Sequence, residues 1–119
     1  MDKWQALNSF FDSFGVNAYD ENVPDREKFP RITYQSSIGS IGNAVQIDAS
    51  VWDLSTSWET VDNIVNAIDN HIKNMGCPQI DGGRYMVSKG TPFAQRMADP
   101  ENTEIKRTVL HINFEFLTE

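Results

Sequence analysis

Hydrophobic and polar residues alternate along VQIDASV, residues 45–51, and the pattern changes abruptly a few residues later. The odd-numbered residues of this stretch are apolar and share one side of a predicted strand, whereas Trp52 continues its polar side. From residue 61 to residue 75 apolar residues recur at steps of three and four, which places them on one helix face. The sequence therefore predicts a strand followed directly by an amphipathic helix.

The ends of this helix carry their own signals. Thr56 as N-cap and Glu59 three residues later match a capping box, so we expect the helix to begin directly after Thr56. Gly76 and Pro78 predict its end. A shorter helix is predicted at the N-terminus, where Asp2 is a capping residue and Gly15 a terminator. Its predicted apolar face consists of Trp4, Leu7, Phe10, Phe11 and Phe14.

Between the two helices we expect a polar, extended connector over residues 16–30 and a strand over residues 31–37. Residues 36–43 are rich in Ser and Gly and predict a turn or loop. Ile38 and Ile41 are unusual in such a segment. Either they fold back onto the sheet, or they form an exposed apolar tip that a partner covers.

Two further strands are predicted after the second helix. Residues 84–89 form a plausible strand, and residues 90–103 then read as a long loop whose only large apolar residues are Phe93 and Met97. Residues 104–119 form the closing strand, with one buried face made by Leu110, Ile112, Phe114 and Phe116.

These elements predict a single α+β domain over residues 1–119, in the order α-β-β-α-β-β. The expected architecture is a largely antiparallel β-sheet with two main helices packed on one face. Trp52, on the polar side of its strand, fits two roles equally well. It covers a second small core, or it anchors a neighbouring subunit.

Charge and cysteine content narrow the function. The 119 residues include 10 basic and 17 acidic side chains, for a net charge of −7. Without a basic cluster, nucleic-acid binding is disfavoured. A single cysteine, Cys77, permits no internal disulfide and fits a reducing compartment. The N-terminus has no signal-peptide pattern, and no segment has the apolar length of a membrane span, so a soluble cytoplasmic protein is expected.

Catalytic and metal-binding patterns are weak. His71, Cys77 and His111 are too few for a structural zinc site, which needs four N or S ligands. A Cys77–His71 nucleophile and base has no evident third residue to orient it. The Gly-containing segments do not match a phosphate-binding loop. We therefore expect no catalytic residues, no cofactor and no metal.

Three stretches, in order, carry a family resemblance: AYDENVPDREKFPRITY at 18–34, VQIDASVWDLSTSWETVDNIVNAI at 45–68 and RTVLHINFEF at 107–116. With the short N-terminal helix they resemble the tail terminator (tail completion, minor tail) proteins of long-tailed bacteriophages and prophages. The resemblance covers nearly the whole chain as an order of elements. The segments around 36–43 and 90–103 lend it no support.

The resemblance implies a structural role without catalysis. Such proteins form a homo-oligomeric ring, typically a hexamer, at the head-proximal end of the tail tube. The ring stops tube polymerisation and presents a surface to the head–tail connector protein, while DNA passes through its lumen without specific binding. The implied location is the host bacterial cytoplasm during assembly and the virion tail afterwards.

The family has no motif that marks its contact residues, so these are predicted from the residues alone. Apolar groups in loops or on a polar strand face are the candidates for assembly contacts: Ile38, Ile41, Trp52, Phe93 and Met97. Three other functions remain open, namely another head–tail or tail-tube component, a small binding module with an apolar pocket, and an enzyme with a cleft around His71 or several carboxylates.

Overall fold

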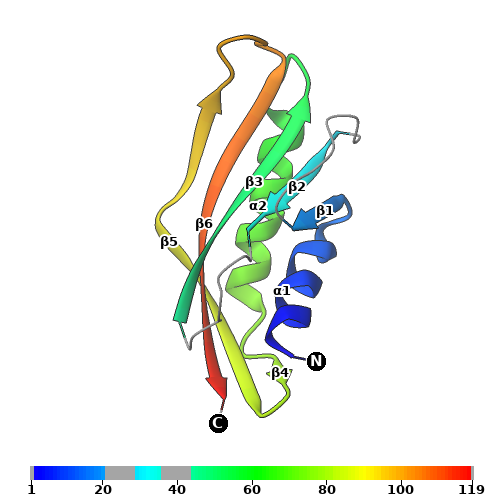
Figure 1. Ribbon diagram of the computed structural model, residues 1–119. Coiled ribbons are helices and arrows are strands. Elements are labelled where there is room, and N and C mark those ends of the chain that lie inside the picture. The colour runs from blue at the N-terminus through cyan, green and yellow to red at the C-terminus, as the bar shows by residue number, and fades with distance from the viewer. Residues whose placement is uncertain (1, 21–28, 36–43, 119) are drawn as a thin grey trace.

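The computed structural model describes residues 2–20, 29–35 and 44–118 (Figure 1). A 3-10 turn at Asp12–Phe14 extends the first helix. The elements, in chain order, are α1 (Lys3–Phe11), β1 (Asn17–Asp20), β2 (Arg31–Tyr34), β3 (Ala44–Leu54), α2 (Glu59–Asn74), β4 (Gln79–Ile80), β5 (Gly83–Ala98) and β6 (Ile105–Thr118).

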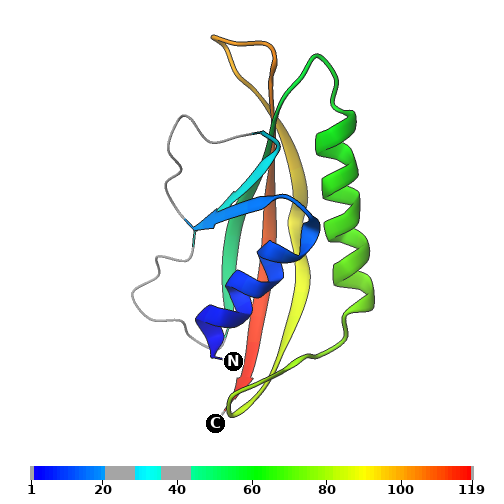
Figure 2. The same ribbon diagram turned by 90° about the vertical axis from the view of Figure 1, so that its right-hand side faces the viewer.

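All strands belong to one sheet in the order β1-β2-β3-β6-β5-β4. Neighbouring strands are antiparallel, with the exception of β1, which pairs in parallel with β2. Figure 2 shows the sheet edge-on, with α2 running along one face. The predicted α+β class, with two helices on a mostly antiparallel sheet, is confirmed. The short strands β1 and β4 are additions to the predicted order.

The core lies between the sheet and the two helices. The predicted alternation is confirmed on β3 and β6, whose inward residues Ile47, Val51, Ile112 and Phe114 are fully buried. From α1, the ring of Phe10 contacts Phe114 edge-on at 5.3 Å between centroids. The helix α2 adds the buried side chains Val61, Ile64, Ile68 and Ile72. Burial of these apolar groups is the main stabilising term of the fold.

The start of the chain follows the prediction with one exception. The Asp2 side chain accepts a hydrogen bond from the backbone N–H of Gln5, and the Gln5 side chain accepts one from the backbone of Asp2, which completes the capping box. Gly15 ends the helical segment with φ of 76°, the left-handed conformation that favours glycine. The prediction was wrong for Trp4, which is 41% exposed.

The start of α2 also differs from the prediction. The helix begins at Glu59, and Thr56 is not its N-cap. The hydroxyl of Ser55 accepts a hydrogen bond from the N–H of Ser57, and the hydroxyl of Ser57 accepts one from the N–H of Glu59. Because these serine side chains satisfy the backbone locally, the chain stays in turns until residue 58.

Two predicted loops contain strands. Within the expected connector at 16–30, residues 17–20 form β1, while 21–28 lie outside the described residues. Most of the expected loop at 90–103 belongs to β5, which continues to Ala98. Gly90 and Pro92 break the strand pattern in the sequence, but pairing with the long strand β6 resumes beyond them. The tertiary pairing thus overrides a weak local signal.

Where β5 passes Gly90 and Pro92, it bulges. Lys89 pairs with Ile112 and Ala94 with Leu110, so five steps along β5 face two along β6. The excess of three residues is odd, and an odd shift exchanges the two faces of a strand. Odd-numbered residues of β5 face the helices before the bulge, and even-numbered residues do so after it.

Two ion pairs join α2 to β5 on either side of this bulge. Asp69 lies 2.9 Å from the Lys89 ammonium, and Asp62 lies 2.7 Å from the Arg96 guanidinium. The two carboxylates are two helical turns apart, about 10 Å along the axis. The two cations pair with positions four residues apart on β6, about 13 Å along the strand. Seven residues of unbroken strand would span about 23 Å, so the bulge makes both pairs possible.

Gly90 is the tightest point of the bulge. A Cβ at this position would lie 2.8 Å from the Cβ of His111 and 2.9 Å from its carbonyl oxygen. We expect Gly90→Ala to lower the free energy of unfolding by about 1–3 kcal/mol, because β5 or β6 must shift. Urea unfolding measures the change. Ser88→Ala, an exposed position on the same strand, is the control and should change stability by less than about 0.5 kcal/mol. Equal stabilities would contradict the close packing.

Asp69 predicts a pH-dependent stability. Hydrogen bonds from Lys89 and then Lys73 lower the pKa of its carboxyl group. A lowered folded-state pKa adds stability above the unfolded-state pKa, and this stability disappears as the pH falls through the folded value. Asp69→Asn should therefore cost about 0.5–1 kcal/mol near pH 7, and the deficit should shrink below about pH 4.

Thermal unfolding of the wild type and Asp69→Asn, near pH 7 and below about pH 4, checks this expectation, with Glu115→Gln as the control. Glu115 is exposed and forms no salt bridge within the described part of the chain. A deficit for Asp69→Asn that stays constant down to acidic pH would show that the ion pairs do not act as described.

Candidate assembly surface

Among the described residues, no helix covers the face of the sheet opposite α2, which is at the front of Figure 1; we call it the open face. Of the five large apolar side chains that are exposed among the described residues, four lie on this face. They are Leu54, Met86, Met97 and Leu117, each 43–50% exposed. Small monomeric proteins carry single exposed apolar residues without consequence, but a grouping on one uncovered face indicates a contact surface.

These side chains divide into two groups at opposite ends of the open face. Leu54 pairs with Ile105, and Met97 pairs with Arg107, next to the turn between β5 and β6. We call these four residues, together with Trp52, the tip patch. Met86 and Leu117 lie at the other end, near the chain's C-terminus, and we call them the base patch.

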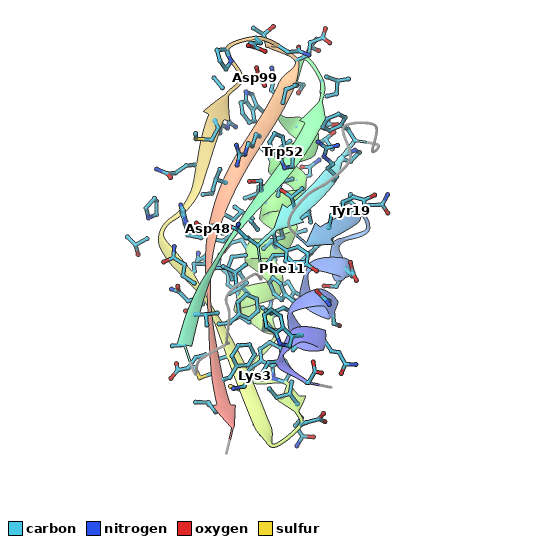
Figure 3. All side chains as sticks on the ribbon, in the orientation of Figure 1. Lys3, Phe11, Tyr19, Asp48, Trp52 and Asp99 are labelled. Carbon is cyan, nitrogen blue, oxygen red and sulfur yellow. The ribbon has the colours of Figure 1, made fainter. Side chains whose placement is uncertain are left out.

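A polar group separates the two patches. Nδ1 of His111 lies 2.8 Å from an Asp48 carboxylate oxygen, and its Nε2 lies 3.4 Å from the Gln95 side-chain oxygen. The three residues come from β6, β3 and β5, and they therefore bridge the middle of the sheet. Asp48 is labelled in Figure 3, well below Trp52. The middle of the open face thus carries polar side chains that hydrogen-bond to one another, and the exposed large apolar side chains described on this face lie at its two ends.

Trp52 is the centre of the tip patch. Its indole N–H donates a hydrogen bond to the Thr33 hydroxyl at 2.9 Å. The guanidinium carbon of Arg107 lies 4.5 Å from the centroid of the ring, and that of Arg31 lies 5.7 Å away. The half-buried indole thus holds two cations on the outer surface of the sheet.

A pocket of about 190 Å³ opens beside this ring. It is lined by Trp52, Met97, Ala98, Asp99, Pro100, Ile105 and Arg107. Figure 3 places Asp99 and Trp52 at the same end of the molecule. The pocket combines an aromatic wall, an apolar rim, the Arg107 guanidinium and the Asp99 carboxylate. Because backbone N–H groups already bind an Asp99 oxygen, the guanidinium is the group that an acidic side chain can contact.

Arg107 is only partly satisfied within its own chain. Its Nε donates to the Ser50 hydroxyl at 3.1 Å, but no carboxylate lies within salt-bridge distance of it in the part of the chain that the structure describes. Burial lowers the pKa of its guanidinium, yet the group stays charged at neutral pH. The Asp99 carboxylate, in the same pocket, accepts hydrogen bonds from the backbone of Glu101 and Asn102.

The predicted contact residues are placed in three different ways. Trp52 and Met97 meet at the tip pocket. Phe93 is half-buried against the core, with the Lys89 ammonium 5.6 Å from its ring. Ile38 and Ile41 lie outside the described residues. Sequence reasoning missed Arg107, Leu54 and Ile105, because an arginine and two apolar residues at strand ends give no distinctive pattern.

The candidate catalytic residues show no catalytic arrangement. His71 packs edge-on against Phe14 at 5.3 Å, and no hydrogen bond joins it to Cys77, which is exposed. Over residues 2–20, 29–35 and 44–118, no three His, Cys, Asp or Glu side chains are grouped so as to hold a metal ion. In those same ranges, no helix has the length and apolar character needed to cross a membrane.

The comparisons with known proteins rest on the fold. No protein-family model matches the chain, and no curated protein matches its sequence. Its fold is similar to the solved structure of the gp17 protein of bacteriophage SPP1, with a TM-score of 0.61 and 18% sequence identity. The match covers 95% of this chain and 87% of that one. The chain therefore shares the fold of a bacteriophage protein along nearly its whole length.

Phe93 and Met97 should respond differently to substitution. Phe93→Ala removes a ring that packs against the core, so we expect the monomer to lose about 1–3 kcal/mol of unfolding free energy. Met97→Ala removes a side chain that is 45% exposed and should change stability by less than about 0.5 kcal/mol. Urea unfolding at low protein concentration compares the two. A larger loss for Met97 would mean that the tip patch belongs to the monomer's own core.

Proposed function

We propose that this protein is a structural component of a bacteriophage tail. In this role it acts as a tail terminator that forms a ring on the tail tube and joins the tube to the head connector. The observation that carries the proposal is the fold similarity to a bacteriophage protein, which spans 95% of this chain and 87% of the other. The order of sequence elements supports the same family, since the three resembling stretches supply β1, β2, β3, α2 and β6.

The architecture suits such a role. The buried core lies on the helix side of the sheet. Folding of a single chain therefore does not depend on contacts at the open face. The two apolar patches on that face are left for contacts with other proteins, and they lie at opposite ends of a molecule 47 Å long. A subunit with two separate contact regions can meet different neighbours at its two ends, as a protein between tube and connector must.

The charge of the chain is consistent with a DNA-conducting ring. Each chain has a net charge of −7. A ring of such chains repels the phosphate backbone and lets DNA pass without binding it. In this proposal DNA is not a ligand, and the partners are further copies of the chain, the tail-tube protein and the connector protein. A basic lumen in the assembled ring would contradict this part of the proposal.

Electron microscopy with purified tail tubes tests the function. We expect the protein to bind one end of each tube and to stop the addition of further tube subunits. Tubes incubated without the protein are the control. A protein that ignores tube ends, or that stacks into tubes of its own, would contradict the terminator role, and self-stacking would instead identify a tail-tube component.

Light scattering over a concentration series tests the ring separately. A closed oligomer near six subunits is the expected species, as the family resemblance implies. A mass that keeps rising with concentration would indicate open polymerisation and would contradict a closed ring.

A further inference from the structure

Over residues 2–20, 29–35 and 44–118, Arg107 in the tip patch forms no ion pair, although the chain as a whole is acidic. Lys73, Lys89 and Arg96 all pair with carboxylates of α2. Arg107 has a hydroxyl and an aromatic ring as its partners, and its environment is partly desolvated. A carboxylate that binds such a half-buried guanidinium is stabilised by charged hydrogen bonds, which strengthen as water is excluded.

We propose that the pocket between Trp52 and Arg107 binds a carboxylate side chain from a second copy of this chain. Met97 and Leu54 cover the apolar part of the incoming segment. This inference rests on the proposed ring and names one of its subunit contacts. It adds Arg107 and Leu54 to the predicted contact residues Trp52 and Met97.

The shape of the pocket favours a carboxylate over other groups. Trp52 holds the Arg107 guanidinium from one side, and Ser50 accepts from its Nε, so the outer edge of the guanidinium remains for a ligand. That edge presents parallel N–H groups that match the two oxygens of a carboxylate. Met97, Pro100 and Ile105 add apolar surface beside this position, and the Asp99 carboxylate, bound by backbone N–H groups, completes the lining. The apolar part excludes water once a side chain enters.

The surplus of acidic side chains makes a second copy a suitable source of the carboxylate. Two chains of net charge −7 repel each other, so a stable contact between them needs local complementarity. Each copy has 17 acidic against 10 basic residues and therefore offers surplus carboxylates. The Arg107 guanidinium at the contact point converts part of this repulsion into attraction. The same pocket would reject a copy that approaches through its own basic tip.

Paired substitutions at Met97 isolate the charge of the incoming group. Met97 is 45% exposed at the rim of the pocket, so neither Met97→Glu nor Met97→Lys removes a core contact. If the ligand is a carboxylate, Glu repels it and Lys attracts it. We expect self-association of Met97→Glu to be at least about tenfold weaker than that of Met97→Lys, as measured by sedimentation equilibrium.

Ser88 supplies the control. It is exposed on the same face of the sheet and belongs to neither patch. Ser88→Glu and Ser88→Lys differ in charge by the same amount as the Met97 pair, and they should differ from each other in self-association by less than about threefold. Arg107→Gln should weaken self-association, whereas Arg84→Gln, the same change at an exposed arginine of β5, should not. Thermal unfolding of each variant in dilute solution verifies that it is folded.

Cross-linking identifies the partner carboxylate. A carbodiimide joins the new amine of Met97→Lys to a carboxylate in direct contact, through an amide bond that forms with loss of water. In a mixture of isotopically light and heavy copies, we expect light–heavy cross-links from residue 97, and none from Ser88→Lys. Cross-links found only within one copy would overturn the inference.

The remaining outcomes separate this contact from the proposed function. A wild-type chain that stays monomeric up to about 1 mM would overturn the second-copy contact, since that concentration detects even weak association. Equal self-association of the two Met97 variants would overturn it as well, while binding to tube ends would still support the terminator role. Failure to bind tubes, together with a large difference between the Met97 variants, would reject the function and leave the contact standing.

Discussion

The bulge in β5 is the constraint on which the rest of the structure depends. The paired strands β5 and β6 are long enough to extend past the core, and α2 must bridge both halves of β5. The bulge shortens the distance that β5 spans between Lys89 and Arg96. Both cations can therefore reach carboxylates on α2. Without the bulge the strand would carry Arg96 about 10 Å too far, and only one ion pair would form.

The same bulge decides which side chains face outward. An excess of three residues exchanges the faces, so Met97 lies on the open face together with the even-numbered Met86. In an unbroken strand Met97 would face α2, and Arg96 would lie on the open side. The tip pocket exists because Met97 and Arg107 meet across β5 and β6 beyond the bulge. One irregularity thus links the packing of the helix to the composition of the candidate assembly surface.

The sequence predicted the parts of the fold that rest on strict periodicity. The alternation in β3 and β6 and the apolar face of α2 were correct, because burial on one side imposes that pattern directly. The upper half of β5 was missed, since Gly90 and Pro92 are typical of loops and only pairing with β6 makes that segment a strand. Two predicted contact residues, Trp52 and Met97, lie together, but Phe93 packs against the core because it falls within the bulge. Arg107 could not be predicted, because only the folded structure shows that no carboxylate of the described ranges lies within salt-bridge distance of it.

The structure and the proposed ring give Trp52 two separate roles. Within the chain its ring lies against Arg107 and its indole N–H donates to Thr33, and in the proposed ring it would also line the pocket that receives a neighbouring subunit. In the proposed ring this arrangement explains how strongly acidic subunits associate in only one way. General repulsion keeps copies apart in most orientations, and the contact at Arg107 offsets it in the orientation that brings a carboxylate to the tip. A few local interactions on a repulsive background favour a defined oligomer over aggregation.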